Sequence, residues 1–325
     1  MEESSSGVRF RTISCVAPAA TRAGPAGYDR RMPTASNRAG LLLLVDLDGV
    51  LYRGSTPVPG VAAVLARRAA AGDDVVYVTN NSMWYRAEYV DRIAGMGAPV
   101  DVDHIVSSPR ATALYLVDHE PSIKHVLTLG ASGLERELED AGFQVTRAAD
   151  VADGLAGAGF EGTDGPDGWE AAGRPDAVVV GLDPRLTYQR LAVAADCIRG
   201  GARFIATNRD PVYPTERAIR PGAGAVVAAV EAATGVVPVS IGKPEPYLLE
   251  EAARAVGRDA REAIMIGDGL TTDIAAARAV GARSILMLTG VSTRAQLDDV
   301  AAADRPTAVA ADAAELEEAL ERLSR

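Results

Sequence analysis

The chain has 325 residues, of which 48% are hydrophobic and 24% are charged, and its formal net charge is −11. The length suits two domains, and the composition is that of a globular protein. The acidic balance excludes a general nucleic-acid binder, because phosphate contacts need clustered Lys and Arg, and no apolar run is long enough to span a membrane.

The first 38 residues are rich in Arg, Ser, Ala and Gly and have no apolar segment of the kind found in secretory signals. We expect a disordered extension there, with Met32 as an alternative start. The two cysteines, Cys15 and Cys197, have neither metal-ligand spacing nor a disulfide framework. Their usage favours a reducing, cytoplasmic setting.

After residue 38, short apolar runs alternate with longer helical patterns, which is typical of βαβ units around a parallel sheet. We expect strands at Leu41–Val45, Val75–Val78, His104–Ser107, Val126–Leu129, Ala177–Val180, Phe204–Ala206, Val237–Ile241, Ala263–Ile266 and Ser284–Leu288. We expect helices at Gly60–Ala71, Tyr85–Met96, Gly133–Ala141, Tyr188–Gly200, Ala223–Thr234, Pro246–Val256 and Thr272–Val280. The Gly- and Asp-rich stretch Gly154–Gly173 predicts a long surface loop, and Glu315–Glu321 predicts a solvated helix face.

Two carboxylates follow the first strand directly, in the segment Asp46-Leu47-Asp48-Gly49. Side chains two residues apart on a strand point the same way, so Asp46 and Asp48 begin on one side of its carboxyl end. Open α/β sheets bind ligands at that end. An ordinary acidic turn is the alternative, and this segment alone does not decide between the two.

A run of polar side chains, Thr79-Asn80-Asn81-Ser82, follows the second strand and precedes a helix. The Thr79 hydroxyl and the free N–H groups of the helix start can bind a phosphate oxygen. An ordinary helix cap is the alternative.

The third segment is Gly242-Lys243-Pro244, which places one of only two lysines of the chain on a turn after a strand. The Lys243 ammonium can neutralise both a carboxylate and a phosphate, although most lysines are solvated surface charges.

In the fourth segment another apolar strand ends in Gly267-Asp268, and Asp273 stands at the following helix start. Asp268 can bind a metal and Asp273 can orient it, while a helix cap is again the alternative. All four segments stand at expected carboxyl ends of strands, so we expect one crevice. Crowded carboxylates repel, and a hard cation with oxygen ligands relieves this, which favours Mg²⁺.

These segments resemble, in order, the four motifs of the haloacid dehalogenase superfamily in its phosphatase branch. The sequences Asp-Leu-Asp-Gly-Val-Leu-Tyr and Val-Thr-Asn-Asn-Ser, and a large stretch between the second and third motifs, are similar to subclass IIA. That subclass includes 4-nitrophenyl, phosphoglycolate and glycerol phosphate phosphatases. The resemblance covers roughly Leu41 to Thr293 and implies a Rossmann-like parallel-sheet core with an inserted α/β cap domain.

The resemblance implies roles for the matching residues. Asp46 would be the nucleophile and a magnesium ligand. Asp48 would be the general acid and base, and would bind Mg²⁺ through its backbone carbonyl. Thr79 and Lys243 would hold the phosphoryl group. Asp268 would complete the metal site, with Asp273 in support.

The implied domains are an extension at 1–38, a first core part at 39–108, a cap at 109–216 and a second core part at 217–325. Asn80 and Asn81, together with Asp183 and Asn208 of the cap, are candidate substrate contacts, although plain strand-ending turns explain the cap segments equally well. The expected partner is a small phosphorylated metabolite, with no nucleic acid or membrane, and a homodimer stays open.

Other functions were weighed against the phosphatase. A phosphotransferase would use the same nucleophile, and a phosphonate hydrolase would need Lys124 of the cap as its Schiff-base lysine. A dinucleotide-binding enzyme lacks its full fingerprint, because Val227 stands where the third glycine belongs. A non-catalytic phospho-metabolite-binding module is the alternative outside enzymes. The sequence leaves the ester open among glycerol phosphate, phosphoglycolate and others.

Overall fold

The structure, a computed structural model, describes residues 40–155, 168–214 and 218–325. The expected extension at 1–38, with Cys15, lies outside the described residues, as does most of the expected loop Gly154–Gly173. None of the helices in the described ranges is long and apolar enough to cross a bilayer.

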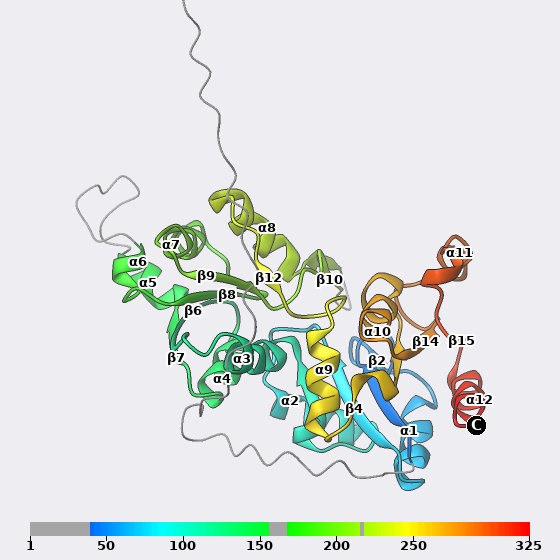
Figure 1. The fold of residues 1–325 in the computed structure, drawn as a ribbon. Helices are drawn as coiled ribbons and strands as arrows, with labels where there is room; N and C mark the ends of the chain where they lie inside the picture. The colour runs from blue at the N-terminus through cyan, green and yellow to red at the C-terminus, as the bar shows by residue number, and fades with distance from the viewer. Residues whose placement is uncertain (1–39, 156–167, 215–217) are drawn as a thin grey trace, which may run out of the picture.

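A parallel sheet of six strands forms the first unit of the fold (Figure 1). Its strands, in spatial order, are β15 (Ala308–Ala310), β14 (Arg283–Met287), β13 (Ala263–Gly267), β1 (Leu42–Asp46), β4 (Asp74–Thr79) and β5 (Ile105–Ser107). The central strand β1 is buried along its whole length, as the unbroken apolar run predicts.

Helices cover both faces of this sheet, so successive β1 residues enter different cores. Leu42 and Leu44 pack with the helices α3 (Ser108–His119), α9 (Tyr247–Ala255) and α10 (Ala275–Val280). Leu43 and Val45 pack with α1 (Val61–Ala70), α2 (Arg86–Gly95) and α12 (Ala313–Leu323). The expected solvated helix face at Glu315–Glu321 belongs to α12, in which Glu315, Glu318 and Glu321 are exposed while Leu316 and Leu320 of the opposite face are buried.

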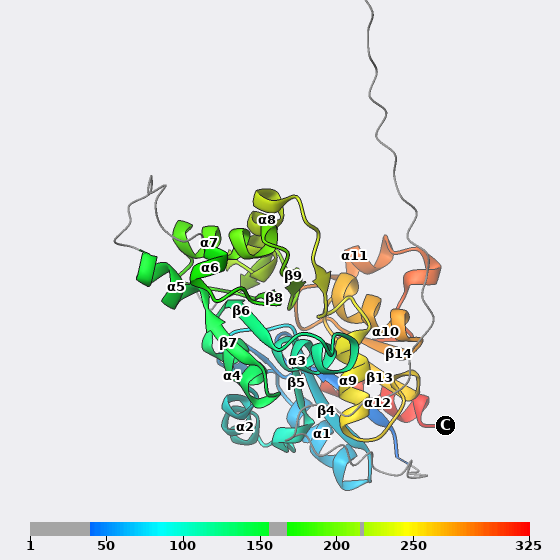
Figure 2. The ribbon, with the colours of Figure 1, turned by 60° about the vertical axis from the view of Figure 1, so that its left-hand side comes forward.

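A second parallel sheet of five strands forms the inserted unit, which lies beside the first sheet in both views (Figures 1 and 2). Its strands, in spatial order, are β12 (Val239–Ser240), β9 (Arg203–Ala206), β8 (Ala177–Val180), β6 (His125–Leu129) and β7 (Gln144–Arg147). Its helices are α4 (Ser132–Asp140), α5 (Ala148–Leu155), α6 (Gly168–Ala171), α7 (Tyr188–Arg199) and α8 (Ala223–Thr234). Helix α3 contacts both α4 and α9 and so joins the two units.

The remaining described elements are short. They are the hairpin β2 (Tyr52–Arg53) with β3 (Thr56–Pro57), the hairpin β10 (Val212–Pro214) with β11 (Ile219–Pro221), helix α11 (Arg294–Asp298), the 3-10 helices Val102–His104, Ala260–Glu262 and Ala302–Asp304, and the π-helical turn Leu270–Ile274.

The expected parallel α/β core with an inserted α/β unit is confirmed, but one expected boundary differs. Helix α8 packs in the core of the second sheet, and β12 pairs with β9 at its edge. The return to the first unit therefore falls after Ser240 and not at 217. The expected loop Gly154–Gly173 also contains a helix, α6, whose Trp169 packs in the same core.

The buried core of the first unit contributes to the free energy of unfolding of the protein. We expect Leu44→Ala to lower the free energy of unfolding by about 2–5 kcal/mol, because it leaves a cavity among fully buried neighbours. Val237→Ala, at a side chain that is 68% exposed, should cost less than about 0.5 kcal/mol. Urea denaturation followed by circular dichroism measures both, and equal effects would contradict this packing.

Candidate active site

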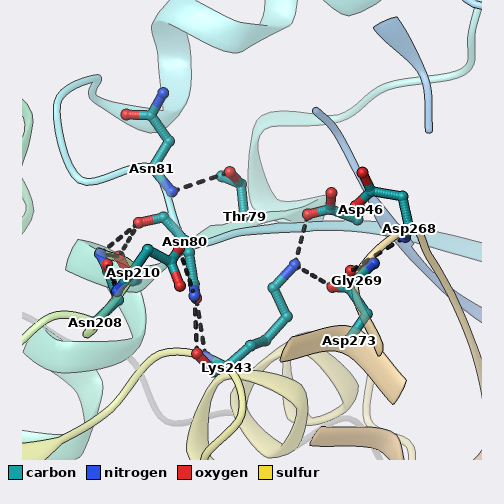
Figure 3. Close-up of polar contacts among 11 residues, drawn as sticks. Asp46, Thr79, Asn80, Asn81, Asn208, Asp210, Lys243, Asp268, Gly269 and Asp273 are labelled. Atoms are coloured by element: carbon teal, nitrogen blue, oxygen red, sulfur yellow. Dashed lines mark hydrogen bonds and ion pairs between the residues drawn. The ribbon is translucent and has the colours of Figure 1, made fainter. Parts of the chain in front are cut away.

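The Lys243 ammonium lies between two carboxylates in a buried position (Figure 3). Its Nζ donates to Asp46 Oδ1 at 2.5 Å and to Asp273 Oδ1 at 2.6 Å. Burial lowers the pKa of Lys243, but the carboxylates of Asp273 and Asp46 outweigh this and raise the pKa above its ordinary value. The lysine is therefore a fixed cation between the ends of β1 and β13.

Three of the predicted carboxylates meet at this point. Ligand oxygens of Asp46, Asp268 and Asp273 all lie within 4.8 Å of one another, and all three residues are buried. Burial, and then the charge of Asp273, raise the pKa of Asp268 to about 7. Three buried carboxylates against one ammonium leave an excess of negative charge, which a hard divalent cation would neutralise.

The donor set fits such a cation, and the three carboxylates are not equivalent in it. Asp273 Oδ1 already accepts from Lys243, and its Oδ2 accepts from the N–H groups of Asp268 and Gly269 at 3.2 and 2.9 Å. Asp273 therefore contacts both the lysine and the turn after β13, and its supporting role in a metal site stays a prediction. Asp46 Oδ1 accepts from Lys243, and Asp268 Oδ2 accepts from the Val291 N–H. The other carboxylate oxygen of each residue takes no part in these two contacts.

Two glycines make the room that Asp268 needs. A Cβ atom built on Gly290 would lie 1.6 Å from Asp268 Oδ2, and one built on Gly49 would lie 2.1 Å from it. Gly49 also has a φ of +85°, a conformation that L-residues rarely adopt. Asp268 follows β13, while Gly49 and Gly290 follow β1 and β14, the strands on either side of it, so the close approach of these three strand ends requires both glycines.

Asp48 lies on the β1 turn, outside the three-carboxylate cluster. It pairs with Tyr52 through an isolated backbone bridge. Burial raises the pKa of the Asp48 carboxyl, and the charges of Arg92 and Lys243 oppose this shift. Asp48 thus stands beside the cluster as a carboxyl with a raised pKa, which is the property that a general acid needs.

Thr79 stands at the end of β4, as predicted, and is buried. Its Oγ1 accepts from the Asn81 N–H at 3.1 Å, which leaves the hydroxyl hydrogen for another acceptor. Asn81 Oδ1 accepts from the Met83 N–H at 3.0 Å, and the Asn81 side chain hydrogen-bonds Tyr213 of the inserted unit.

Asn80 and Asn208 were expected to contact substrate, but their amides bind protein groups. Asn80 Nδ2 donates to the Lys243 carbonyl at 2.9 Å and to Asp210 Oδ2 at 3.0 Å. Asn208 Nδ2 donates to the Asn80 carbonyl at 2.7 Å. Both residues therefore tie the inserted unit to the Lys243 turn.

Asp183 is also engaged within the protein. Its Oδ2 pairs with Arg190 Nη1 at 3.1 Å, and its Oδ1 accepts from the Arg185 N–H at 2.8 Å. This arrangement is a local turn before α7, which was the alternative considered for the segment. The predicted residues that the structure brings together are thus Asp46, Asp268, Asp273 and Lys243.

Sequence reasoning missed two residues at this site, Asp210 and Tyr213, which both belong to the inserted unit. Burial raises the pKa values of both side chains, and Lys243 acts on the first and Asp48 on the second. The polar run around Asn208 marked the right segment, but no spacing rule indicated that the Asp210 side chain would bind Asn80.

Comparisons with known proteins agree with this geometry. A profile described as haloacid dehalogenase-like hydrolase matches residues 43–144, and one described as HAD-hydrolase-like matches residues 240–316. An acid sugar phosphatase of Staphylococcus aureus is 35% identical over 257 residues, which cover 79% of this chain and 88% of that protein.

Solved structures give the same result. A p-nitrophenyl phosphatase from Archaeoglobus fulgidus has a TM-score of 0.73 at 29% identity, over 86% of this chain and 99% of that one. A glycerol phosphate phosphatase from Mycobacterium tuberculosis, in complex with calcium, has a TM-score of 0.71 at 33% identity, over 85% of this chain and 74% of that one. The chain therefore belongs to the haloacid dehalogenase-like hydrolase family, among its phosphatases, and the predicted resemblance is confirmed.

The glycine at 290 offers a test of the cluster. We expect Gly290→Ala to reduce phosphatase activity by roughly 10²-fold, because the new methyl group displaces the Asp268 carboxylate from its neighbours. Gly95→Ala, where nothing lies within 4 Å of the added Cβ, is the matched control and should leave activity unchanged. Initial rates of phosphate release measure both, and full activity in Gly290→Ala would contradict the close approach.

Proposed function

We propose that the protein hydrolyses small phosphomonoesters with Mg²⁺ through an aspartyl-phosphate on Asp46. The observation that carries the proposal is the Lys243 ammonium bound between Asp46 and Asp273, with Asp268 in the same cluster. An ammonium and a cation site beside a buried carboxylate would let an anionic phosphate approach an anionic nucleophile.

In the first step, a carboxylate oxygen of Asp46 attacks phosphorus while the bond from phosphorus to the ester oxygen breaks. Asp48 gives its proton to that leaving oxygen, as its raised pKa favours. Lys243 holds Asp46 Oδ1, which directs the other oxygen of the carboxylate to the substrate. Thr79 donates its hydroxyl hydrogen to a phosphoryl oxygen.

In the second step, water attacks the phosphorus of the aspartyl-phosphate and Asp48 takes its proton. The bond between phosphorus and Asp46 breaks, inorganic phosphate leaves, and both carboxylates return to their starting states. Mg²⁺, held by Asp46, Asp268 and the Asp48 carbonyl, would offset the charge of the phosphoryl group. The magnesium and calcium complexes of the mycobacterial relative support a divalent metal in this family.

The substrate is a small phosphate ester, and sugar or polyol phosphates are its best-supported class. The support is the names of the relatives, which are an acid sugar phosphatase, a p-nitrophenyl phosphatase and a glycerol phosphate phosphatase. The inserted unit supplies Tyr213, whose side chain hydrogen-bonds Asn81 and whose pKa is raised by burial and by the charge of Asp48, so Tyr213 is a candidate contact for the leaving group. The cytoplasmic location and the homodimer stay predictions.

The nucleophile is tested by phosphate release from a panel of small esters, with and without Mg²⁺, for the native protein and Asp46→Asn. We expect the substitution to lower kcat by roughly 10³-fold or more, since it removes the attacking carboxylate. Removal of metal with EDTA should abolish turnover, and Mg²⁺ should restore it. Asp259→Asn, at a half-buried aspartate that pairs with Arg261 and lies outside the three-carboxylate cluster, is the control; native turnover by Asp46→Asn would refute the mechanism.

Asp48 is tested by the identity of the leaving group. With Asp48→Asn we expect 4-nitrophenyl phosphate to give a burst of one nitrophenolate per site and then slow turnover, because this leaving group needs no proton. An alkyl phosphate such as glycerol phosphate should give no burst, since its leaving oxygen must be protonated. Stopped-flow absorbance and quench-flow phosphate assays measure the two, and steady-state rates like those of the native protein would contradict the role.

A further inference from the structure

The catalytic lysine is carried by a segment that begins in the second sheet. Strand β12 pairs with β9, and the pairing continues as the Ile241 N–H donates to the Ala206 carbonyl at 3.1 Å. The Gly242 N–H then donates to the Thr207 carbonyl at 2.7 Å. The main chain before Lys243 is thus held by the inserted unit, while its ammonium reaches Asp46 of the first unit.

The side-chain amide of Asn80 hydrogen-bonds both the N–H and the carbonyl group of Lys243. Its Oδ1 accepts from the Lys243 N–H at 2.9 Å, and its Nδ2 donates to the Lys243 carbonyl at 2.9 Å (Figure 3). A Cβ atom on Gly242 would lie 2.6 Å from Asn80 Oδ1, so the two chains are in close contact. The position of the Lys243 main chain therefore depends on the Asn80 amide and on how its oxygen and nitrogen are oriented.

Asp210 of the inserted unit binds the nitrogen of the Asn80 amide. Its Oδ2 accepts the second hydrogen bond of Asn80 Nδ2, at 3.0 Å. A carboxylate only accepts hydrogen bonds, so it favours the amide orientation that turns nitrogen toward it and oxygen toward the Lys243 N–H. Asp210 is itself held in place, because its N–H donates to Asn208 Oδ1 at 3.1 Å and its carbonyl accepts from the Gly224 N–H at 2.8 Å.

We propose that Asp210 is a positioning residue through which the inserted unit places the catalytic lysine. Its carboxylate orients the Asn80 amide, the amide holds the main chain of Lys243, and the ammonium then meets Asp46. The inference rests on the proposed function for the role of Lys243. It gives the inserted unit a part in the chemical step, in addition to any contact that it makes with substrate.

The test compares kcat and KM for Asp210→Ala, Asp210→Asn, Asn80→Ala and the double variant Asp210→Ala/Asn80→Ala, with 4-nitrophenyl phosphate and Mg²⁺. We expect Asp210→Ala to lower kcat by roughly 10- to 100-fold, the usual cost of losing a group that orients a catalytic residue. Its KM should change by less than about threefold, because substrate binding is not touched directly. Asp210→Asn retains an acceptor oxygen for Asn80 and should stay within about threefold of the native kcat.

The double variant should be no slower than Asn80→Ala alone, since both substitutions break one chain of contacts. Asp176→Ala removes a carboxylate of the same unit that accepts only the backbone N–H groups of Lys124 and His125, and should behave as native. Circular dichroism and thermal unfolding establish that each variant is folded. Should Asp210→Ala not fold, Asp210→Asn alone decides, since a kcat loss of tenfold or more would contradict the proposal.

Two other results would overturn the inference. An unchanged kcat in Asp210→Ala would mean that Lys243 needs no such support. A rise in KM that is equal in the Ala and Asn variants, at native kcat, would make Asp210 a substrate contact. Asp46→Asn, measured in the same assay, separates the two proposals. Native turnover in Asp46→Asn would refute the proposed function, whereas the kcat of the Asp210 variants tests only the positioning role.

Discussion

The ion pair between Lys243 and its two aspartates is the interaction on which the site depends. Asp46 ends a strand of the first sheet, whereas Lys243 follows the edge strand of the second. An ammonium that is buried without a partner would lose several kcal/mol to desolvation, so the pairing forces the two units into one arrangement. The contact between Lys243 and the proposed nucleophile, Asp46, is therefore also a contact that joins the two units.

The same crowding explains why small residues surround the carboxylates. Asp46, Asp268 and Asp273 repel one another in a buried place, and only a cation or a proton relieves the repulsion. Gly49 and Gly290 leave no side chain between the strand ends, which lets the carboxylate of Asp268 enter the cluster. Space and charge thus favour the same occupant, because a small, hard cation would fit among these carboxylates and would neutralise them.

The inserted unit is fastened to the first one next to the chemistry. Helix α3 packs against both units, while Asn80, Asn208 and Asp210 hold the turn that carries Lys243. The two amides are buried and the carboxylate is half-buried, and each finds its partner on the other unit. The inserted unit is thus tied by hydrogen bonds to the turn that carries Lys243.

The sequence by itself determined the parallel strands, the four motifs and the carboxylates, because buried strands are unbroken apolar runs and their ends carry the polar side chains. It misplaced the boundary at 217, since a two-residue edge strand such as β12 is too short to show which sheet it joins. It also expected Asn80 and Asn208 to face substrate. Only the tertiary structure decided these points, because the partner of an amide depends on which distant segments the fold brings within hydrogen-bonding distance, and local sequence pattern does not record that.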